Sequence, residues 1–496
     1  MPASSHTQQY IVLPPRGMVA TDMTASHATQ TYLVSLHSAM GRGGPRRVRK
    51  TVAPLRVLDS IHENGAKLVE MSPQSASDLR AEQPGIRIVP VVYYYPQIYM
   101  PPLPAQPPRV ATATVGAKIV IKIVSQSNGH PISGAMVVAF TDFTNRIGAQ
   151  GMTNKNGEAA LGLGGSSKKL ERLYVYPDKG FWSALKRNVT VSSGKTISLR
   201  PLDLSYIDAL RFFYGSSADT AGENMTVGVV DTGVGPHPDL HVVGGENTVT
   251  GENPQDFGDN GEGHGTHVGG IIAARGTPPV GIRGLAPAVA LRSYRVFGKN
   301  SKGASNFSIA KAIDRAVAQG CDLINMSLGG GPADIVTREA MADARARGCL
   351  VLAASGNDDR SPVSFPASDS LCLAISAMGR KLTFPSGTTQ AGTVAAPYGQ
   401  DPKNFVAAFS NIGPEIDLIA PGVGIISTVP GGYATMDGTS MACPAATGMA
   451  AKILATHPNI LAMPRNQARS DEMAKVVLKS AKPLGFGPTY EGQGML

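Results

Sequence analysis

Short apolar runs alternate with amphipathic helical stretches between residues 225 and 354, and this alternation restricts the fold more than any other feature. The apolar runs predict buried strands, and the stretches between them carry apolar residues at helical spacing. The predicted strands are 225–230, 289–296, 321–326 and 350–354, and the predicted helices are 264–274, 305–319 and 335–347. Strands and helices in this order form a parallel, doubly wound α/β sheet flanked by helices. Functional residues in such a sheet lie beyond the carboxyl ends of the strands.

The remainder of the 496-residue chain divides into segments of different composition. Residues 1–29 are polar and aperiodic, and we predict a loose N-terminal tail. Residues 30–95 have the pattern of a small α/β unit. Residues 96–109 hold six prolines and predict an extended linker. Residues 110–200 have β patterning and predict a small β-sandwich, and residues 201–496 hold the doubly wound sheet.

Both smaller units have predicted elements of their own. Within residues 30–95 we predict strands at 31–36, 67–71 and 85–92 and helices at 52–64 and 72–81. Gly65 would end the first of these helices, and Ser72-Pro73 would begin the second. The predicted strands of the sandwich are 117–124, 135–140, 158–161, 173–176 and 196–199.

Composition and charge exclude several kinds of partner. The net charge is +9, but the basic residues are scattered apart from Arg46–Lys50, which we interpret as a solvated loop. No run approaches the roughly 20 apolar residues that span a bilayer, and the first thirty residues lack a secretory signal. We expect no nucleic-acid partner, no membrane partner, and a location in the cytoplasm or outside the cell by a non-standard export route. The four cysteines have apolar or small neighbours, which predicts free, buried thiols.

Three short motifs stand where the fold would place functional residues. Asp231 ends an apolar strand in V-V-D-T-G-V, His264 opens a helix in G-E-G-H-G-T-H, and Ser440 opens an Ala-rich helix in G-T-S-M-A-C-P. Taken singly, Asp231 could be a turn residue, His264 could bind a metal together with His267, and Ser440 could be a helix cap. Together they have a chemical logic. A serine hydroxyl needs a neighbouring base, and an imidazole base needs a carboxylate that fixes its tautomer. Since no third ligand is signalled near the two histidines, we assign no metal.

The order and the local sequences of these motifs resemble the subtilisin-like serine proteases. The resemblance implies a serine endopeptidase in which Asp231 orients the histidine, His264 acts as general base and then acid, and Ser440 attacks the peptide carbonyl. It covers nearly all of residues 221–496 and includes further matching segments, namely 324–330 (I-N-M-S-L-G-G), 353–357 (A-A-S-G-N), 409–413 (F-S-N-I-G) and 420–422 (A-P-G).

The resemblance also implies how a substrate would be held. Asn357 matches the family's oxyanion asparagine, whose side-chain amide stabilises the developing negative charge beside the backbone N–H of Ser440. Ser327, Leu328 and Gly329 match the substrate-binding segment, which pairs with an extended peptide as an added strand. Residues 302–306 would form the facing edge. Binding chiefly through the main chain implies protein or peptide substrates and modest specificity.

Residues 30–95 resemble the family's propeptide, which implies that the chain's own N-terminal segment is an intramolecular inhibitor of a monomeric, self-processed zymogen. The region of Tyr93–Tyr95, or the Pro-rich stretch after it, would then lie in the cleft and be cut. Residues 110–200 resemble a carboxypeptidase-regulatory-like, prealbumin-type sandwich, with spacer, protein contact or carbohydrate contact as its expected role. Many relatives bind calcium after the helix that carries the histidine, but residues 275–279 (R-G-T-P-P) have no carboxylates, so no cofactor is assigned.

Some features depart from the family pattern or admit another interpretation. Ala445 stands where the family usually has histidine, and the extra sequence between Gly379 and Asn404 is predicted to form a surface loop. Cys443 is expected to pack rather than to sense oxidation. An alternative hypothesis is a binding protein without proteolytic activity, with the sandwich as its working part and residues 1–95 as a permanent plug. No constellation supports a cysteine or metal hydrolase.

Overall fold

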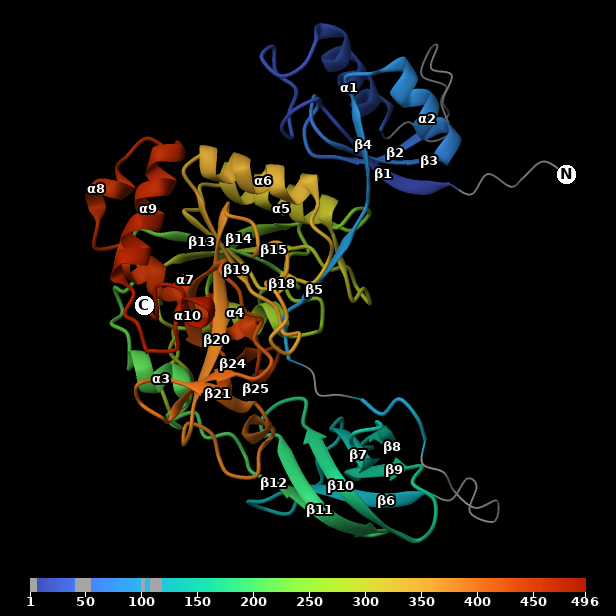
Figure 1. Ribbon diagram of the computed structural model, residues 1–496, viewed down its shortest axis with the longest axis vertical. Helices are drawn as coiled ribbons and strands as arrows, with labels where there is room; N and C mark the ends of the chain where they lie inside the picture. Colours follow the sequence, from blue (N-terminus) through green and yellow to red (C-terminus); the bar gives the residue numbers. More distant parts are fainter. Residues whose placement is uncertain (1–6, 41–54, 100–102, 108–117) are drawn as a thin grey trace, which may run out of the picture.

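The computed structural model of the chain describes residues 7–40, 55–99, 103–107 and 118–496. These residues form an N-terminal unit (residues 7–90), a two-sheet unit (residues 118–201) and a large unit (residues 202–496) (Figure 1). The large unit lies between the two smaller ones, and residues 91–99 run along it from the N-terminal unit toward the two-sheet unit (Figure 1).

The large unit is built on a mostly parallel sheet, as the alternating pattern predicted. Its strand order is β14-β15-β13-β17-β19-β20-β22-β21, and β23 pairs with β20. The pairs from β14 to β20 and the β20–β23 pair are parallel, whereas β22 and β21 are antiparallel additions. The strands are β13 (Thr226–Asp231), β14 (Val242–Asn247), β15 (Ala290–Arg295), β17 (Leu323–Met326), β19 (Leu350–Ala354), β20 (Cys372–Arg380), β21 (Val394–Tyr398), β22 (Asn404–Ala407) and β23 (Ile416–Pro421).

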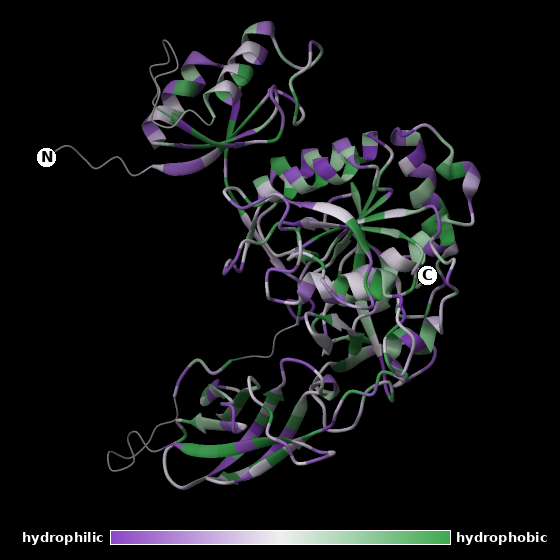
Figure 2. Ribbon diagram, turned by 180° about the vertical axis from the view of Figure 1, so that it is seen from behind, coloured by the Kyte–Doolittle hydropathy of each residue, from purple (hydrophilic) through white to green (hydrophobic). Residues whose placement is uncertain are grey.

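Helices cover both faces of this sheet. Val227 and Leu352 point to the side of α4 (His264–Ala273) and α7 (Thr439–Leu454), and Val230 and Val351 point to the side of α5 (Asn306–Ala318) and α6 (Ile335–Ala346). Hydrophobic residues follow the central strands between the helices (Figure 2). Besides two short strands, β16 (Ala304–Ser305) and β18 (Leu328–Gly329), the remaining elements are α3 (Ala209–Tyr214), the hairpin β24 (Ile425–Val429) and β25 (Gly432–Met436), the 3₁₀ helix η2 (Thr389–Gly392), α8 (Pro458–Leu461), α9 (Gln467–Ser480) and α10 (Pro488–Glu491).

The prediction of a surface loop between Gly379 and Asn404 is wrong for much of that segment. Residues 394–398 form β21, which pairs with β22 and extends the sheet. The sequence of this strand, V-A-A-P-Y, is short and contains a proline, but the free edge of β22 offers its backbone groups hydrogen-bond partners. A pattern of side chains does not reveal such a partner.

The N-terminal unit is a four-stranded antiparallel sheet with two helices on one face. Its strand order is β2-β3-β1-β4. The elements are β1 (Gln8–Leu13), α1 (His27–Ala39), β2 (Leu55–Ser60), β3 (Lys67–Met71), α2 (Pro73–Glu82) and β4 (Arg87–Pro90). The predictions for residues 67–71 and 72–81 agree with β3 and α2, and Ser72 caps α2 by accepting from the backbone N–H of Ser75.

Three predictions in this unit are wrong. The supposed tail, residues 1–29, contains β1, a central strand that bonds to β3 and β4, so a short apolar run is stabilised along both edges. The supposed strand at residues 31–36 lies in α1, because Tyr32, Leu33 and Leu36 share one helical face and Ser26 caps the helix. The supposed helix at residues 52–64 contains β2, which pairs with β3. Residues 1–6 and 51–54 lie outside the described residues.

The sheet of the N-terminal unit has a core on each face. Val12 and Val69 pack against α1 and α2, whereas Ile11, Leu13 and Leu68 point the other way and join a core with Phe307 and other residues of α5 and α6, as well as with Ile61. This is the period of two expected for a strand buried on both sides. The N-terminal unit therefore completes its own fold against the large unit.

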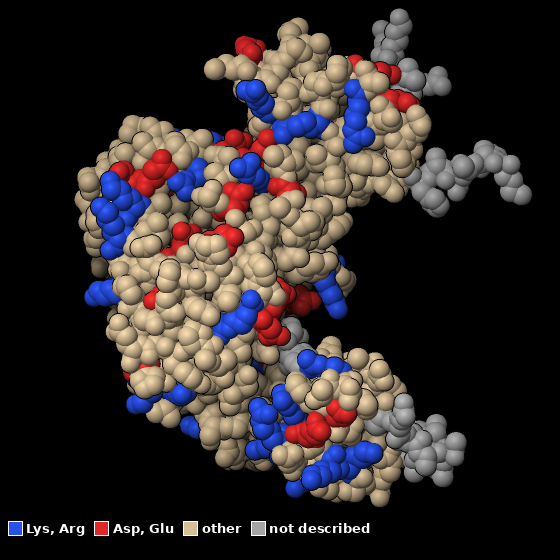
Figure 3. Space-filling model, viewed as in Figure 1, with Lys and Arg blue, Asp and Glu red and all other residues tan. Residues whose placement is uncertain are grey.

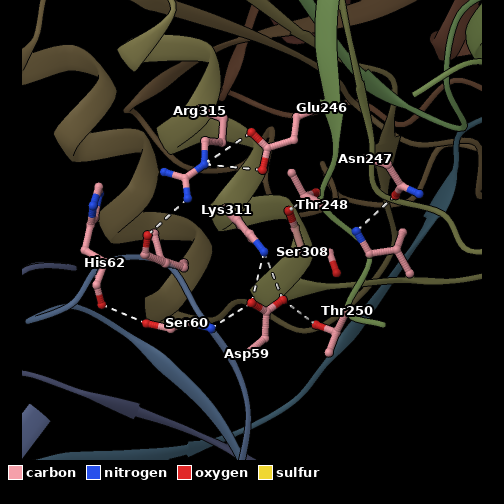
Figure 4. A network of polar contacts seen from close by, with 12 residues as sticks. Asp59, Ser60, His62, Glu246, Asn247, Thr248, Thr250, Ser308, Lys311 and Arg315 are labelled. Atoms are coloured by element: carbon pink, nitrogen blue, oxygen red, sulfur yellow. Dashed lines mark hydrogen bonds and ion pairs between the residues drawn. The ribbon is translucent and has the colours of Figure 1, made fainter. Parts of the chain in front are cut away.

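Polar contacts surround this apolar contact (Figure 4). Both carboxylate oxygens of Asp59 accept from the Lys311 ammonium at 3.0 Å, and one also accepts from the Thr250 hydroxyl at 2.8 Å. Arg87 pairs with Glu339 at 2.6 and 2.8 Å. The side chains of the Asp59–Lys311 pair are only 12% and 14% exposed, so this pair is weakly screened by water.

The two-sheet unit encloses one apolar core between two small sheets. Their strand orders are β11-β10-β7-β8 and β12-β6-β9, and Ile121, Val137 and Leu173 meet between them. The strands are β6 (Ile119–Ser125), β7 (Met136–Asp142), β8 (Ile147–Met152), β9 (Glu158–Leu161), β10 (Ser167–Tyr176), β11 (Ala184–Ser192) and β12 (Thr196–Leu199). The sequence pattern did not indicate β8 or β11.

Surface and composition add three findings. Over the described residues, none of the helices combines the length and apolar character that crossing a membrane requires. All four cysteines are free and buried, as predicted. Basic side chains stand beside acidic ones over the visible face of all three units (Figure 3). The cluster Arg46–Lys50 lies outside the described residues.

Trp182 joins the two-sheet unit to the large unit, and its loss should destabilise the chain. Its ring is 1% exposed and packs against Ala274, Ile282 and Ile426. We expect Trp182→Ala to lower the free energy of unfolding by about 3–5 kcal/mol, measured by denaturant titration with circular dichroism. Since the indole N–H has no partner among the described residues, Trp182→Phe should cost clearly less. Equal costs for the two variants would contradict this view of the contact.

Candidate active site

Asp231 and His264 form a buried pair at the carboxyl ends of the strands. Asp231 is the last residue of β13, and His264 is the first residue of α4. Nδ1 of His264 lies 2.7 Å from Oδ1 of Asp231, which also accepts from the backbone N–H of Thr232 at 2.7 Å. Because an ionised carboxylate only accepts hydrogen bonds, this contact places the ring proton on Nδ1 and leaves Nε2 as a hydrogen-bond acceptor in the neutral ring.

The surroundings hold the histidine and keep its outer nitrogen available. His264 is 3% exposed, and its Nε2 is buried without a hydrogen-bond partner among the described residues. The cap residue before the helix is Gly263, whose φ of 77° favours glycine. The backbone N–H of Gly265, directly after the histidine, donates to the Thr232 hydroxyl. A buried acceptor without a partner is costly, so this nitrogen is suited to receive a proton.

Ser440 lies in the first turn of α7, which packs against α4. Its hydroxyl donates to the backbone carbonyl of Ser327 at 2.9 Å, and the hydroxyl of Ser327 donates to the carbonyl of Ser440 at 3.0 Å. The structure therefore brings Asp231 to His264, and Ser440 to Ser327. It does not join the Ser440 hydroxyl to His264 by a hydrogen bond.

Asn357 lies beside the start of α7 with one half of its amide free. Its Oδ1 accepts from the backbone N–H and the hydroxyl of Thr439 at 2.9 and 3.0 Å. These two donors fix the amide orientation, because only the oxygen can accept. Nδ2 is consequently turned away from Thr439, and it is buried without a partner among the described residues. At the start of α7 there is thus a side-chain N–H that has no acceptor among the described residues.

The segment that the sequence assigned to substrate binding is paired with the chain's own strand β5 (Tyr93–Pro96). Leu328 and Gly329 form β18, which pairs antiparallel with β5. On the other side β5 pairs with β16 (Ala304–Ser305), inside the predicted facing edge, residues 302–306. Residues 93–96 therefore form the middle strand of a three-stranded sheet, and Figure 1 shows β5 next to β18.

Backbone contacts continue past the end of β5. The Gln97 N–H donates to the Ser327 carbonyl at 3.0 Å, and the Gln97 carbonyl accepts from the Ser440 N–H at 3.0 Å. Two residues on, the Tyr99 N–H donates to the Asp437 carbonyl at 2.7 Å. Gly438 permits this approach, because a Cβ there would lie 2.5 Å from the Gln97 carbonyl oxygen. The peptide bond between Gln97 and Ile98 is thus the one held against Ser440.

Tyr94 is fully buried beside β18, whereas Tyr93 and Tyr95 are about half exposed. Its hydroxyl contacts Asp334 Oδ2 at 2.5 Å and the Pro332 carbonyl at 2.7 Å. Burial, and after it the Asp334 carboxyl, raise the pKa of the Tyr94 phenol well above its usual range. Sequence reasoning brought the tyrosines to the cleft but missed Asp334 and Gln97. In the sequence Asp334 can be recognised only as a helix cap. In the structure its Oδ1 does cap α6.

Other residues considered in the sequence have structural partners. Burial lowers the pKa of His267 to about 3, and its Nε2 contacts the carbonyls of Ile425 and Ala434. The thiol of Cys443 is buried, and this burial raises its pKa above the usual range. Residues 275–279 have no carboxylate of their own, and Oδ2 of the neighbouring Asp239 accepts from the Ile282 N–H and the Tyr433 hydroxyl.

Comparison with known proteins agrees with this fold. The sequence profile of the subtilase family matches residues 222–495. Subtilisin BL from Lederbergia lenta is 38% identical over 240 residues, which are 48% of this chain and 79% of that protein. Subtilisin DY from Bacillus licheniformis is 37% identical over 248 residues, 49% of this chain and 80% of that protein. A thermostable alkaline protease from Halalkalibacterium halodurans is 31% identical over 332 residues, 67% of this chain and 80% of that protein.

The parallel α/β sheet and these relatives define the chain as a serine-type endopeptidase, and its substrates are proteins. It belongs to the subtilase family. The predicted enzyme class is thereby confirmed.

The Tyr94 hydroxyl should help to hold β5 in the cleft. In Tyr94→Phe the Asp334 carboxyl loses a buried donor, so we expect the Gln97 amide to exchange with solvent about 10- to 100-fold faster. Hydrogen exchange would be measured with Ser440→Ala as the parent, which lacks the predicted nucleophile. Tyr95→Phe is the matched control, because Tyr95 is 49% exposed. Equal exchange in both variants would show that the contact to Asp334 does not hold the strand.

Proposed function

We propose that Ser440, His264 and Asp231 form the catalytic triad of this endopeptidase. The observation that carries the proposal is the fixed tautomer of His264, with Nδ1–H on Asp231 and a buried Nε2 without a partner among the described residues. In this proposal the Ser440 hydroxyl leaves the Ser327 carbonyl and donates to Nε2 as a substrate is attacked. Such contacts are often absent before the reacting complex forms.

The proposed reaction has two halves. Oγ of Ser440 bonds to the peptide carbonyl carbon while its proton passes to Nε2 of His264, and the oxygen that gains charge accepts from the Ser440 N–H and Asn357 Nδ2. The carbon–nitrogen bond then breaks, and the proton on Nε2 goes to the leaving amine. Water next attacks the acyl group with His264 again as base, which releases the acid and restores the Ser440 hydroxyl.

We further propose that the chain is made as a zymogen and cuts itself between Gln97 and Ile98. The support is the Gln97 carbonyl, which accepts from the N–H of the residue proposed to attack it. The pairing of β5 on both sides orders the peptide on the N-terminal side of this bond as an extended substrate. Ser327, Leu328 and Gly329 would bind other substrates in the same way.

The N-terminal unit would remain bound after the cut and would act as an inhibitor. Its sheet shares an apolar core with α5 and α6, and the Asp59–Lys311 and Arg87–Glu339 pairs lie at the rim. None of these contacts depends on the peptide bond after Gln97. Release would therefore require the N-terminal unit to unfold or to be degraded by a further cut.

Labelling with a fluorophosphonate after the cleaved N-terminal unit has been removed, followed by mass-spectrometric mapping, tests the triad and the self-cleavage together. We expect the label on Ser440 and a new N-terminus at Ile98. Ser440→Ala should remain a full-length chain without label, whereas Ser386→Ala, a change at an exposed serine outside the site, should behave as the wild type. A folded wild-type chain without label would contradict the triad. A labelled chain with a different N-terminus would contradict only the proposed bond.

Asn357 should contribute to the rate rather than to binding. Because its Nδ2 would donate chiefly to the oxygen that gains charge, we expect Asn357→Ala to lower kcat roughly 10²–10³-fold with little change in KM. That magnitude is the one established for the loss of such a donor in a subtilisin. The measurement is steady-state hydrolysis of a peptide anilide after the N-terminal unit is removed. A rise in KM at an unchanged kcat would assign Asn357 to substrate binding instead.

A further inference from the structure

The two-sheet unit has no function in the proposed reaction, yet it lies beside the proposed scissile bond. Pairing through β16 and β18 accounts for the peptide before the cut, residues 93–97. The residues after the cut, Ile98 and Tyr99, lie toward the two-sheet unit. A role for this unit on the side of the leaving amine therefore rests on the proposed bond between Gln97 and Ile98.

The two-sheet unit is fixed in place by contacts with the β24–β25 hairpin and with the segment before η2. The backbone N–H of Gly180 donates to the Tyr433 carbonyl at 2.8 Å, and that of Leu185 donates to the Gly387 carbonyl at 2.8 Å. The hydroxyls of Ser183 and Thr389 lie 2.5 Å apart. Together with the buried Trp182, these bonds hold the end of β10 and the start of β11 against the large unit.

A cavity of about 160 Å³ lies where the two-sheet unit meets the proposed leaving side of the cleft. Ile98 and Tyr99 line it from the cleft, and Met436 and Gln390 line it from the large unit. Met136 of β7 and Tyr176 of β10 line it from the two-sheet unit. One wall of this cavity is therefore made by residues that belong neither to the large unit nor to the N-terminal unit.

Tyr99 lies at the wall of this cavity, as an aromatic residue of a bound peptide would. Its ring stacks on Phe409 with a centroid distance of 4.7 Å and an interplanar angle of 22°. Burial raises the pKa of the Tyr99 phenol to about 12, and Asp359 and Tyr174 add to the rise.

A polar connection links the two-sheet unit to the backbone group that holds Tyr99. The Gln390 amide donates to Asp437 Oδ2 at 2.7 Å, and the Ser183 hydroxyl lies 3.5 Å from Gln390 Oε1. Asp437 is the residue whose carbonyl accepts from the Tyr99 N–H. The position of the two-sheet unit is thus linked both to the backbone group that binds the Tyr99 N–H and to the surroundings of the Tyr99 side chain.

We infer that the two-sheet unit completes the leaving-group side of the cleft and forms, with Phe409, a subsite for an aromatic side chain on the second residue after the scissile bond. The ligand class is an extended peptide with tyrosine or a similar aromatic residue at that position. Met136 and Tyr176 determine this preference by contact, and Asp437 positions the peptide backbone.

A competition between two peptides tests this subsite. The first has the sequence of residues 93–99, Tyr-Tyr-Tyr-Pro-Gln-Ile-Tyr, and the second has alanine at the last position. Both are mixed with the self-processed wild-type enzyme after removal of the N-terminal unit, and the products are quantified by mass spectrometry. The ratio of the two kcat/KM values is independent of the fraction of enzyme whose cleft is free, so residual binding of the chain's own segment 98–99 cancels.

We expect the wild-type enzyme to prefer the tyrosine peptide roughly tenfold, the scale of an aromatic stacking contact. Met136→Ala and Tyr176→Ala should each move this ratio toward one. Met152→Ala is the matched control for Met136→Ala. It changes the same residue type in the same sheet, directly opposite Met136 in the β7–β8 pair, but at a side chain that is 59% exposed. This control should keep the wild-type ratio.

Two other outcomes would overturn the inference in distinguishable ways. Cleavage of both peptides between Gln and Ile with a ratio near one, or a ratio unchanged in Met136→Ala and Tyr176→Ala, would remove the role of the two-sheet unit and leave the proposed bond intact. Cleavage at another bond, or of neither peptide, would overturn the proposed function together with this inference.

Discussion

The pairing of β5 on both of its edges is the interaction on which the rest of the structure depends. Side chains of a strand alternate between faces, so this register buries Tyr94, leaves Tyr93 and Tyr95 half exposed, and sets the Gln97 carbonyl on the Ser440 N–H. A shift by one residue would bring Tyr94 out of its site beside Asp334 and would present a different carbonyl. The buried phenol is therefore what selects the peptide bond that meets Ser440.

The N-terminal unit and the large unit share this constraint, because the sheet of the N-terminal unit is buried on both faces. Val12 faces its own helices, and Ile11 and Leu13 face α5 and α6. Separation of the two units would expose the second apolar face to water, which costs a free energy of about 25 cal/mol for each Å² of apolar surface. Folding of this unit and occupation of the cleft by β5 are therefore coupled energetically, which suits the inhibitory role proposed for this segment.

In the role inferred for it, the two-sheet unit contributes through its position rather than through a site within its own fold. Trp182 and a few backbone hydrogen bonds fix it beside the β24–β25 hairpin, and the outer face of its four-stranded sheet, with Met136 and Tyr176, turns toward Tyr99. The same loops of the large unit that carry this contact also lead into α7. A change in the contact between the two-sheet unit and these loops would consequently alter the start of α7, the helix that carries Ser440.

The sequence by itself determined the class of protein, the doubly wound sheet and the residues proposed for catalysis, because Asp231, His264, Ser440 and Asn357 stand in local motifs at strand ends and helix starts. It failed for residues 1–64, where short apolar runs such as 8–13 and 31–36 fit a strand or a helix equally well and pairing partners decide. Only the tertiary structure joined Tyr94 to Asp334, Gln97 to Ser440 and Tyr99 to the two-sheet unit. Those contacts link residues far apart in the chain. The periodicity of apolar residues and the spacing of motifs describe local structure only, so they do not show which distant residues meet.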